Sequence, residues 1–572
     1  MYKKQGGKNM LRKSTKVTAL MVVAASIISM VPATAADVKK VESQDGTVYY
    51  GKAKGNGVFI IDGEINEKDE GSVYYVADGK YNELKNADSG ADISGDIFQN
   101  KYVEFDGGDY YIDVTNGDKT DESIADNWHD DIASAVRKNL KNDNDGRLAD
   151  SNFSGKIVDA KGQATNGNKP FLNGAMGNWS EFQYTLKNSN TNGVGYSEIY
   201  SGPDGKYIDA DYNLGNFGVV TKTTSDAVTI KNTKDTYEIT KDGVDYELKA
   251  QIDSSMGVSE GYDYILRSAN ISIWGKLKSA PDVASSYSNM TDQFNFGSKS
   301  NSKSVPLSGS GATTSVSVLQ KISKAQSSDD VDGIKYAKDT STYFKTDSDG
   351  KAQEIYRTIS TNSAGILAVK TVGKTLYAQE IKLKAENGFY YTDLSDSDSI
   401  DNDDANWTSG TNFNFGGGML YCLADGYVQM WNNVDSFEKL YKVDGAMNKM
   451  SASNKDNIIV WNEDDEVYSV IANAPTGKTA TTNASATTAT TIKVGWSQAA
   501  DGTWSFVKAD GTKATAWYQY GTTWYYLKAN GVMQTGWIND NGTWYYCNGS
   551  GAMLANTTID GYVLVANGAW AK

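Results

Sequence analysis

The C-terminal segment Gly521-Thr522-Thr523-Trp524-Tyr525-Tyr526-Leu527 returns as Gly542-Thr543-Trp544-Tyr545-Tyr546-Cys547, with its tryptophan twenty residues further on. A shorter version, Gly502-Thr503-Trp504, has its tryptophan twenty residues before the first. A period of twenty residues with glycine-bounded turns predicts one β-hairpin per repeat. Because a lone hairpin is only marginally stable in water, successive hairpins are expected to stack as a solenoid.

This pattern resembles the choline-binding, or cell-wall-binding, repeats of Gram-positive surface proteins over residues 493–572. The closing stretch Thr557-Thr558-Ile559-Asp560-Gly561-Tyr562 is similar to the ending of clostridial members of that family. The resemblance implies a left-handed hairpin solenoid that binds choline on teichoic acids. Related repeats in glucan-binding enzymes and clostridial toxins bind sugars with similar aromatic residues, so wall carbohydrate is the alternative ligand.

In that family each choline lies between adjacent hairpins, among two tryptophans of one repeat and an aromatic residue of the next. A quaternary ammonium ion is attracted to aromatic ring faces by about 0.5–2 kcal/mol per contact. The resemblance places three candidate cages on this sequence: Trp496, Trp504 and Tyr525 in the first, Trp517, Trp524, Tyr545 and Met533 in the second, and Trp537, Trp544 and Tyr562 in the third.

The repeats also depart from one another. Lys513 stands where the later repeats carry Met533 and Met553. Some of the aromatic rings must fill the solenoid core rather than bind ligand. Strand alternation leads us to expect Tyr526 and Tyr546 on the core side.

Before the repeats, residues 37–472 are predicted to be mainly β. Tyrosine-rich and β-branched runs alternate with Asp-Gly and Asn-Gly turns about every ten residues, which is typical of antiparallel sheets. The length suits about seven four-stranded blades of a β-propeller, with a chain of β-sandwiches as the alternative. One blade is expected from four runs: Tyr427–Trp431, Phe437–Val443, Ile458–Trp461 and Val467–Ile471.

One helix is predicted near residues 121–141, where apolar residues recur four apart from Trp128 to Leu140. The run from Val316 to Ser323 fits a short helix or a strand. Residues 473–490, rich in Thr and Ala, have no apolar periodicity and are predicted to be a flexible linker.

The charge distribution limits partners and location. The 572-residue chain has a formal net charge of −16, which argues against nucleic acid as a partner. Basic residues precede an apolar run from Val17 to Val31 and the triplet Ala33-Thr34-Ala35. This pattern predicts a signal peptide over residues 1–35, hence an exported protein at the cell wall, and no transmembrane segment is expected.

Few residues are available for catalysis or metal binding. His129 is the one histidine, which excludes zinc sites that need two. Cys422 and Cys547 are predicted to be packing thiols without a disulfide. Two acidic segments, Asn142–Gly146 and Asp393–Asp404, are weighed as calcium sites, and solvated turns are favoured for both.

We therefore expect a non-enzymatic surface protein held non-covalently on choline-bearing wall polymers, whose β-rich region has an unknown binding role. The alternative class is a wall hydrolase that uses a pair of carboxyl groups, for which 71 acidic residues leave ample supply.

Overall fold

The computed structural model describes the chain in segments: residues 38–55, 57–65, 70–98, 101–153, 179–188, 195–261, 263–279, 286–361, 365–403, 405–432, 435–472, 495–498, 504–507, 513–520, 523–528, 531–540, 543–548, 551–555, 557–559, 562–565 and 568–571. The chain divides into two compact units, Met1–Ala472 and Asn473–Lys572. The predicted signal peptide and the predicted linker lie outside the described residues.

The fold is mainly β, as predicted, and the described part of the first unit contains eight sheets. Four sheets come from the two ends of this unit, and we name them A to D. Sheet A consists of β7 (Ile93–Phe98), β8 (Tyr102–Phe105), β9 (Tyr110–Asp113) and β10 (Lys119–Thr120). Sheet B consists of β3 (Thr47–Gly55), β4 (Val58–Glu64), β5 (Ser72–Ala77) and β6 (Lys80–Glu83).

Sheets C and D combine strands from both ends of the unit. Sheet C consists of β37 (Lys449–Asn454), β38 (Asn457–Asn462), β39 (Val467–Ala472) and β2 (Gln44–Asp45). Sheet D consists of β33 (Phe413–Gly416), β34 (Met419–Ala424), β35 (Tyr427–Trp431), β36 (Phe437–Lys442) and β1 (Lys39–Lys40).

The middle of the unit forms sheets E to H. Sheet E consists of β27 (Thr358–Thr361), β28 (Ile366–Val372), β29 (Thr375–Glu380) and β32 (Ser397–Asp401). Sheet F contains β16 (Tyr237–Lys241), β17 (Val244–Glu260), β18 (Tyr264–Leu277), β23 (Ser315–Ser323), β26 (Thr340–Phe344), β31 (Phe389–Asp393) and β30 (Lys382–Glu386), with β19 (Ser288–Asn289) and β22 (Leu307–Ser308) beside it.

Sheet G consists of β11 (Ser180–Thr185), β12 (Tyr196–Ser201), β13 (Tyr207–Asp209), β25 (Ile334–Ala337) and β24 (Gln326–Val331). Sheet H consists of β15 (Ala227–Asn232), β14 (Asn213–Thr221), β20 (Phe294–Gly297) and β21 (Ser302–Lys303). Three short 3-10 turns, η1 (Asp150–Phe153), η3 (Thr291–Gln293) and η4 (Gly311–Thr313), complete the described elements of this unit apart from one helix.

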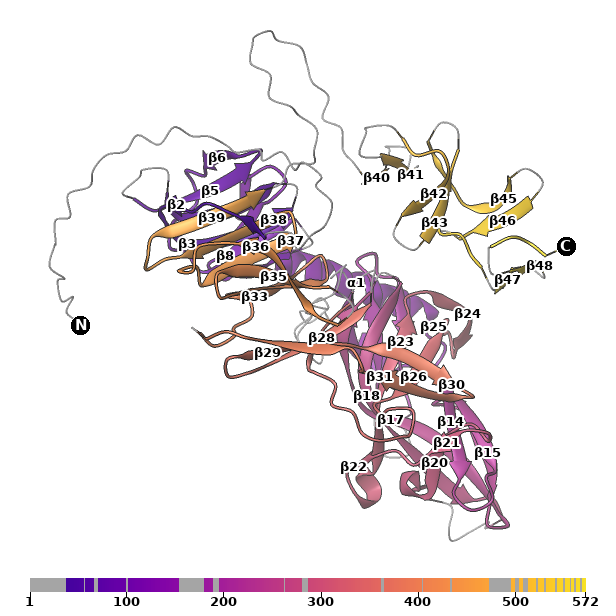
Figure 1. Cartoon of the computed structure of the whole chain (residues 1–572). Coiled ribbons are helices and arrows are strands. Elements are labelled where there is room, and N and C mark those ends of the chain that lie inside the picture. Colours follow the sequence, from indigo (N-terminus) through magenta and orange to yellow (C-terminus); the bar gives the residue numbers. More distant parts are fainter. Residues whose placement is uncertain are drawn as a thin grey trace, which may run out of the picture. The chain divides into compact units, whose positions relative to one another are not determined.

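Sheets A to G pack face to face in succession, each pair through its own apolar cluster, and Figure 1 shows B, C and D side by side. The order follows from clusters that contain residues of two sheets. One residue from each sheet illustrates each shared cluster: Phe105 and Val73 for A–B, Phe59 and Ile459 for B–C, Val460 and Val428 for C–D, Leu420 and Leu376 for D–E, Ala368 and Leu319 for E–F, Ile322 and Tyr200 for F–G. Inward-facing apolar residues on alternate strand positions supply these clusters.

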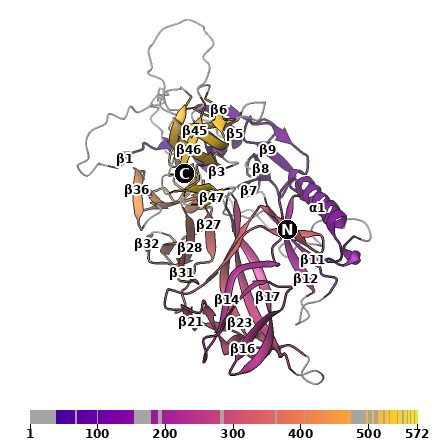
Figure 2. The ribbon, with the colours of Figure 1, turned by 90° about the vertical axis from the view of Figure 1, so that its right-hand side faces the viewer.

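The one α-helix of the described residues, α1 (Ile124–Asp143), confirms the predicted helix. It follows β10 of sheet A and buries Ile132, Val136 and Leu140 against Phe182 and other residues of sheet G, beside β11 and β12 in Figure 2. The helix therefore connects the first sheet of the succession with the last. The ambiguous run from Val316 to Ser323 is a strand, β23.

Face-to-face packing of successive sheets fits a propeller and a chain of β-sandwiches alike, so the propeller stays a prediction. Sheet F departs from a four-stranded blade because β17 and β18, of 17 and 14 residues, extend well beyond their neighbours. Sheet H packs on the extended part, where Phe217 and Phe296 contact Phe344 with ring centroids 5.9 Å and 5.5 Å away.

The prediction that the runs from Tyr427 to Ile471 form one blade is wrong. β35 and β36 belong to sheet D, whereas β38 and β39 belong to sheet C. The sequence of β37, Lys-Met-Ser-Ala-Ser-Asn, carries little strand signal, so the strand that starts sheet C was missed. Sheets C and D each receive one strand from the other end of the unit: β1 pairs with β36 in sheet D, and β2 pairs with β39 in sheet C.

The second unit consists of four hairpins in its described part. They pair β40 (Gly495–Gln498) with β41 (Trp504–Val507), β42 (Ala516–Tyr520) with β43 (Thr523–Leu527), β45 (Gly536–Asp540) with β46 (Thr543–Cys547), and β47 (Thr557–Ile559) with β48 (Tyr562–Leu564). The short strand β44 (Met533–Gln534) pairs with β43. One hairpin per repeat is the predicted arrangement.

Candidate functional site

Backbone hydrogen bonds join each hairpin of the second unit to the next. The Met553 N–H donates to the Trp524 carbonyl at 2.8 Å, and the Trp570 N–H donates to the Trp544 carbonyl at 2.7 Å. Bridges at corresponding positions link Ser505 to Val532 and Tyr525 to Ala552. These contacts place a fixed set of aromatic residues from adjacent repeats close together.

The core side of the hairpins is identified by its buried residues. Phe506, Ala514 and Leu527 form the cluster, and Tyr525 packs against it. Cys547, in the position that corresponds to Leu527, is also fully buried.

The expectation that Tyr526 and Tyr546 face the core is therefore wrong. Their neighbours Leu527 and Cys547 point inward, and alternation places the two tyrosines on the other face. There Tyr526 contacts Trp517 and Tyr546 contacts Trp537, with ring centroids 5.1 Å and 5.2 Å apart. The alternation was correct, but the wrong residue was taken as the inward one.

Ring contacts between adjacent repeats are described at the second and the third candidate cages. In the second, Trp517 meets Tyr545 of the next hairpin, with centroids 4.8 Å apart and planes at 68°. The Trp517 Nε1–H donates to Asp540 Oδ2 at 3.1 Å, which fixes the orientation of its ring. Trp524 of the same cage is 39% exposed, so its ring is accessible.

The third cage has the same contact between a tryptophan and a tyrosine of the next hairpin, and Trp544 adds a third ring. Trp537 lies 5.3 Å from Tyr562, in the relation that Trp517 has to Tyr545, and 6.5 Å from Trp544. Both interplanar angles are 78°. Tyr562 is 44% exposed.

The first cage is described only in part. The side chain of Trp496 lies outside the described residues. Trp504 is 40% exposed, whereas Tyr525 packs against the Phe506 cluster. The geometry of the first cage is therefore only partly within the described residues.

Met533 also packs beside the Phe506 cluster, and its sulfur lies under the turn at Gly551. A Cβ at Gly551 would be only 2.2 Å from that sulfur, so the flexible Met533 side chain would have to move, and the φ of +83° itself favours glycine. Because Gly551 belongs to the repeat that carries Tyr545, Met533 reaches from one repeat to the next.

Comparison with known proteins agrees with this geometry. A family model described as a choline-binding repeat matches residues 514–557. The choline-binding domain of Spr1274 in Streptococcus pneumoniae is 44% identical, over 14% of this chain and 96% of that one, with a TM-score of 0.14. The chain belongs to the choline-binding repeat family.

Two further solved structures match more weakly. The pneumococcal cell-wall endolysin from phage Cp-1, complexed with choline, is 24% identical over 18% of this chain and 29% of its own length, with a TM-score of 0.13. Choline-binding protein F from Streptococcus pneumoniae is 16% identical over 63% of this chain and 100% of its own, with a TM-score of 0.14. No curated protein matches the chain in sequence. TM-scores of 0.13 and 0.14 carry no information on the fold of the first unit.

Two cysteines lie outside the candidate cages. Cys422 is fully buried between sheets D and E, where burial raises its pKa far above the usual range. Burial also raises the pKa of Cys547 to about 11. Both cysteines are free and buried, as predicted, and thiols of this kind are poor nucleophiles at neutral pH.

The two acidic segments weighed for calcium use their side chains locally. Asp143 accepts a hydrogen bond from the Tyr207 hydroxyl at 2.6 Å, and Asn144 Oδ1 accepts one from the Leu148 N–H at 2.8 Å. Asp396 pairs with Lys382. The described residues contain no group of three or more His, Cys, Asp or Glu side chains arranged for a metal ion. The His129 side chain lies outside the described residues.

Two carboxyl groups lie close together in sheet G. They belong to Glu181 of β11 and Glu198 of β12, which occupy diagonal positions on the two paired strands. Burial first, and then the hydrogen bond and charge of Glu181, raise the pKa of Glu198 to about 9. Glycosidases hold their two carboxyl groups about 5 Å or more apart, with the substrate bond between them. Here the two carboxyl groups are only 7% and 2% exposed, so a substrate cannot reach them and this pair does not fit that chemistry.

The same interior contains a buried arginine. Arg267 of β18 is 0% exposed and donates from Nη1 to Asp211 Oδ1 at 2.6 Å, from Nη2 to the Ala210 carbonyl at 2.8 Å and from Nε to Gln320 Oε1 at 3.0 Å. The other Asp211 oxygen, Oδ2, accepts the Glu198 N–H at 2.9 Å. The arginine thus ties sheet F to sheet G at the point where the carboxyl pair is buried.

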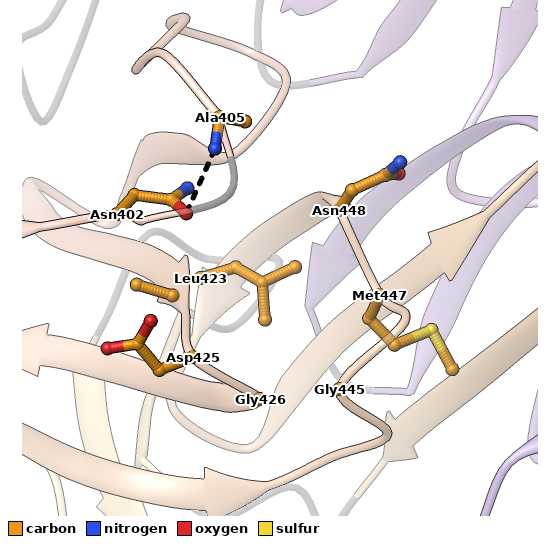
Figure 3. A pocket seen from close by; sticks show the side chains of 9 residues that line it. Asn402, Ala405, Leu423, Asp425, Gly426, Gly445, Met447 and Asn448 are labelled. Atoms are coloured by element: carbon orange, nitrogen blue, oxygen red, sulfur yellow. Dashed lines mark hydrogen bonds between the residues drawn. The ribbon is translucent and has the colours of Figure 1, made fainter. Parts of the chain in front are cut away.

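A small cavity lies at one end of sheet D, between the β34–β35 turn and the segment before β37 (Figure 3). Leu423, Asp425 and Met447 line it, and the Asn402 amide oxygen accepts the Ala405 N–H at 3.3 Å beside it. Its volume of about 20 Å³ accommodates little more than one water molecule, so it is too small for a sugar or peptide.

No described helix is long and apolar enough to cross a membrane.

Proposed function

We propose that this chain is exported and is held non-covalently at the cell surface by choline groups of wall polymers, which bind between the hairpins of its second unit. The observation that carries the proposal is the contact of Trp517 with Tyr545 across two repeats, and Trp524 on the same hairpin as Trp517 has an exposed ring. Rings at steep angles present several faces to one cation, which suits an ammonium ion that cannot donate a strong hydrogen bond.

The family supports this proposal, and so does the number of sites. Each cage contributes a modest affinity, and linked cages on one unit gain by acting together on a polymer that carries many choline groups. We propose that the cages comprise Trp496, Trp504 and Tyr525; Trp517, Trp524, Tyr545 and Met533; and Trp537, Trp544 and Tyr562. The first unit is then the part of the protein that is displayed.

The test is retention of the full chain on a resin that carries a quaternary amine. Because the chain has a net charge of −16, it will also bind such a resin as an ion exchanger. Loading and washing in about 1 M salt removes that contribution, since the Debye length falls to about 3 Å. We expect the chain to stay bound at high salt and to elute with free choline.

Two variants sharpen this test. Replacing both Trp524 and Trp544 by leucine removes a ring from the second and the third cage, and retention at high salt should fall to near zero. Thr543→Ala changes an exposed neighbour of Trp544 and should elute like the unaltered chain. An unaltered chain that passes through the resin at high salt but binds dextran or isolated wall glycan would favour a carbohydrate ligand and overturn the choline proposal.

A further inference from the structure

The last residues of the chain contain a tryptophan that the repeat pattern leaves unassigned. Trp570 lies beyond the matched residues 514–557 and does not follow the twenty-residue spacing of the other tryptophans. Its place in the fold is nevertheless regular. Leu527, Cys547 and Leu564 are the buried residues of successive hairpins, and they pair with Met533, Met553 and Trp570.

A second contact gives the same equivalence. The Met553 N–H donates to the carbonyl of Trp524, and the Trp570 N–H donates to the carbonyl of Trp544. Trp570 therefore occupies, beside the third cage, the backbone position that Met553 occupies beside the second. An aromatic ring replaces a thioether at this position.

The ring of Trp570 continues the series of the third cage. Its centroid is 5.1 Å from that of Tyr562, and the two planes meet at 86°. Tyr562 is in turn nearly perpendicular to Trp537, and Trp537 to Trp544, each at 78°. Successive rings at near right angles are the walls of a box, and a cation inside such a box faces several ring quadrupoles together.

We infer that Trp570 is a ligand-binding residue that supplies a fourth aromatic wall to the third cage and makes it the tightest quaternary-ammonium site of the chain. This inference rests on the proposed function. The positions that correspond to Trp570 in the preceding repeats are held by Met533 and Met553, and a thioether lacks the face of negative potential that attracts a cation.

The experiment isolates the third cage in the full chain. Trp504→Leu together with Trp524→Leu removes exposed rings from the first and second cages, so the remaining site should bind one choline per chain in a calorimetric titration. In this background we expect Trp570→Leu to weaken choline binding by about tenfold, and Trp570→Phe to weaken it by no more than about threefold. Val565→Ala, an exposed change in the same terminal hairpin, should have no effect.

A neutral ligand separates a cation–π contact from simple packing. 3,3-Dimethylbutan-1-ol has the shape of choline without its charge, so its affinity should be weak and insensitive to Trp570→Leu. Equal choline affinity with leucine and with tryptophan, or equal losses with phenylalanine and with leucine, would overturn the inference while choline binding by the unaltered chain still stands. Absence of any choline binding by the unaltered chain would overturn the proposed function, and the role of Trp570 with it.

Discussion

Arg267→Met is expected to lower the free energy of unfolding of the first unit by about 3–5 kcal/mol. The arginine is fully buried, and its removal leaves Asp211, Gln320 and the Ala210 carbonyl without their donor. An unpaired buried charge costs far more than the intact pair contributes. Urea unfolding of the full chain, followed by circular dichroism, measures this change.

Two further variants test the cause. Arg357→Met removes an exposed arginine and should leave the unfolding midpoint unchanged. Adding Asp211→Asn to Arg267→Met removes the orphaned charge and should recover about 1–2 kcal/mol. A single Arg267→Met chain as stable as the unaltered one would show that the network between sheets F and G contributes little.

The second large effect is a pH dependence. Burial and Glu181 raise the pKa of Glu198 from 4.5 to about 9, so the folded chain keeps a proton that the unfolded chain releases. Because the folded state binds more protons, stability is lost as pH rises from about 4.5 towards 9. Glu198→Gln keeps the shape of the neutral acid and cannot ionise.

We therefore expect Glu198→Gln to match the unaltered chain near pH 4 and to be more stable by about 3 kcal/mol at pH 7. The groups that face Glu198 include Glu181, Arg267, Asp211 and Tyr200, and Arg267 opposes the shift. Burial also raises the pKa of Asp211, to about 6, which adds a smaller loss of stability in the same direction.

Thermal unfolding from pH 4 to pH 9 measures this effect, with Glu438→Gln, an exposed carboxylate on β36, as the control. A stability difference between Glu198→Gln and the unaltered chain that does not grow with pH would show that Glu198 ionises normally in the folded protein.

The second unit was largely predictable from sequence because its information is local and repeated. Glycine-bounded turns and the spacing of Trp504, Trp524 and Trp544 fix one hairpin per repeat. Alternation alone does not say which face is inward, and Tyr526 was placed on the wrong side for that reason. Trp570 was missed because the last hairpin is shorter, so its spacing from Trp544 breaks the period.

The first unit was predictable only as mainly β. Hairpin signals identify strands that are neighbours in sequence, but they do not show which sheet receives a distant strand. The contacts of Arg267 join residues 53 to 57 positions apart in the sequence, and no local pattern announces them. The same limit applies to the carboxyl pair, since its raised pKa depends on burial between two sheets.

The pairing of β1 with β36 and of β2 with β39 has a consequence for the order of assembly. β1 and β2 pair with strands about 400 residues further along the chain. Such distant pairing slows folding, because a large loop must close before the contacts form. Sheets C and D can therefore be completed only after nearly all of the first unit has been synthesised, whereas the sheets in the middle of the unit need no strand from its ends.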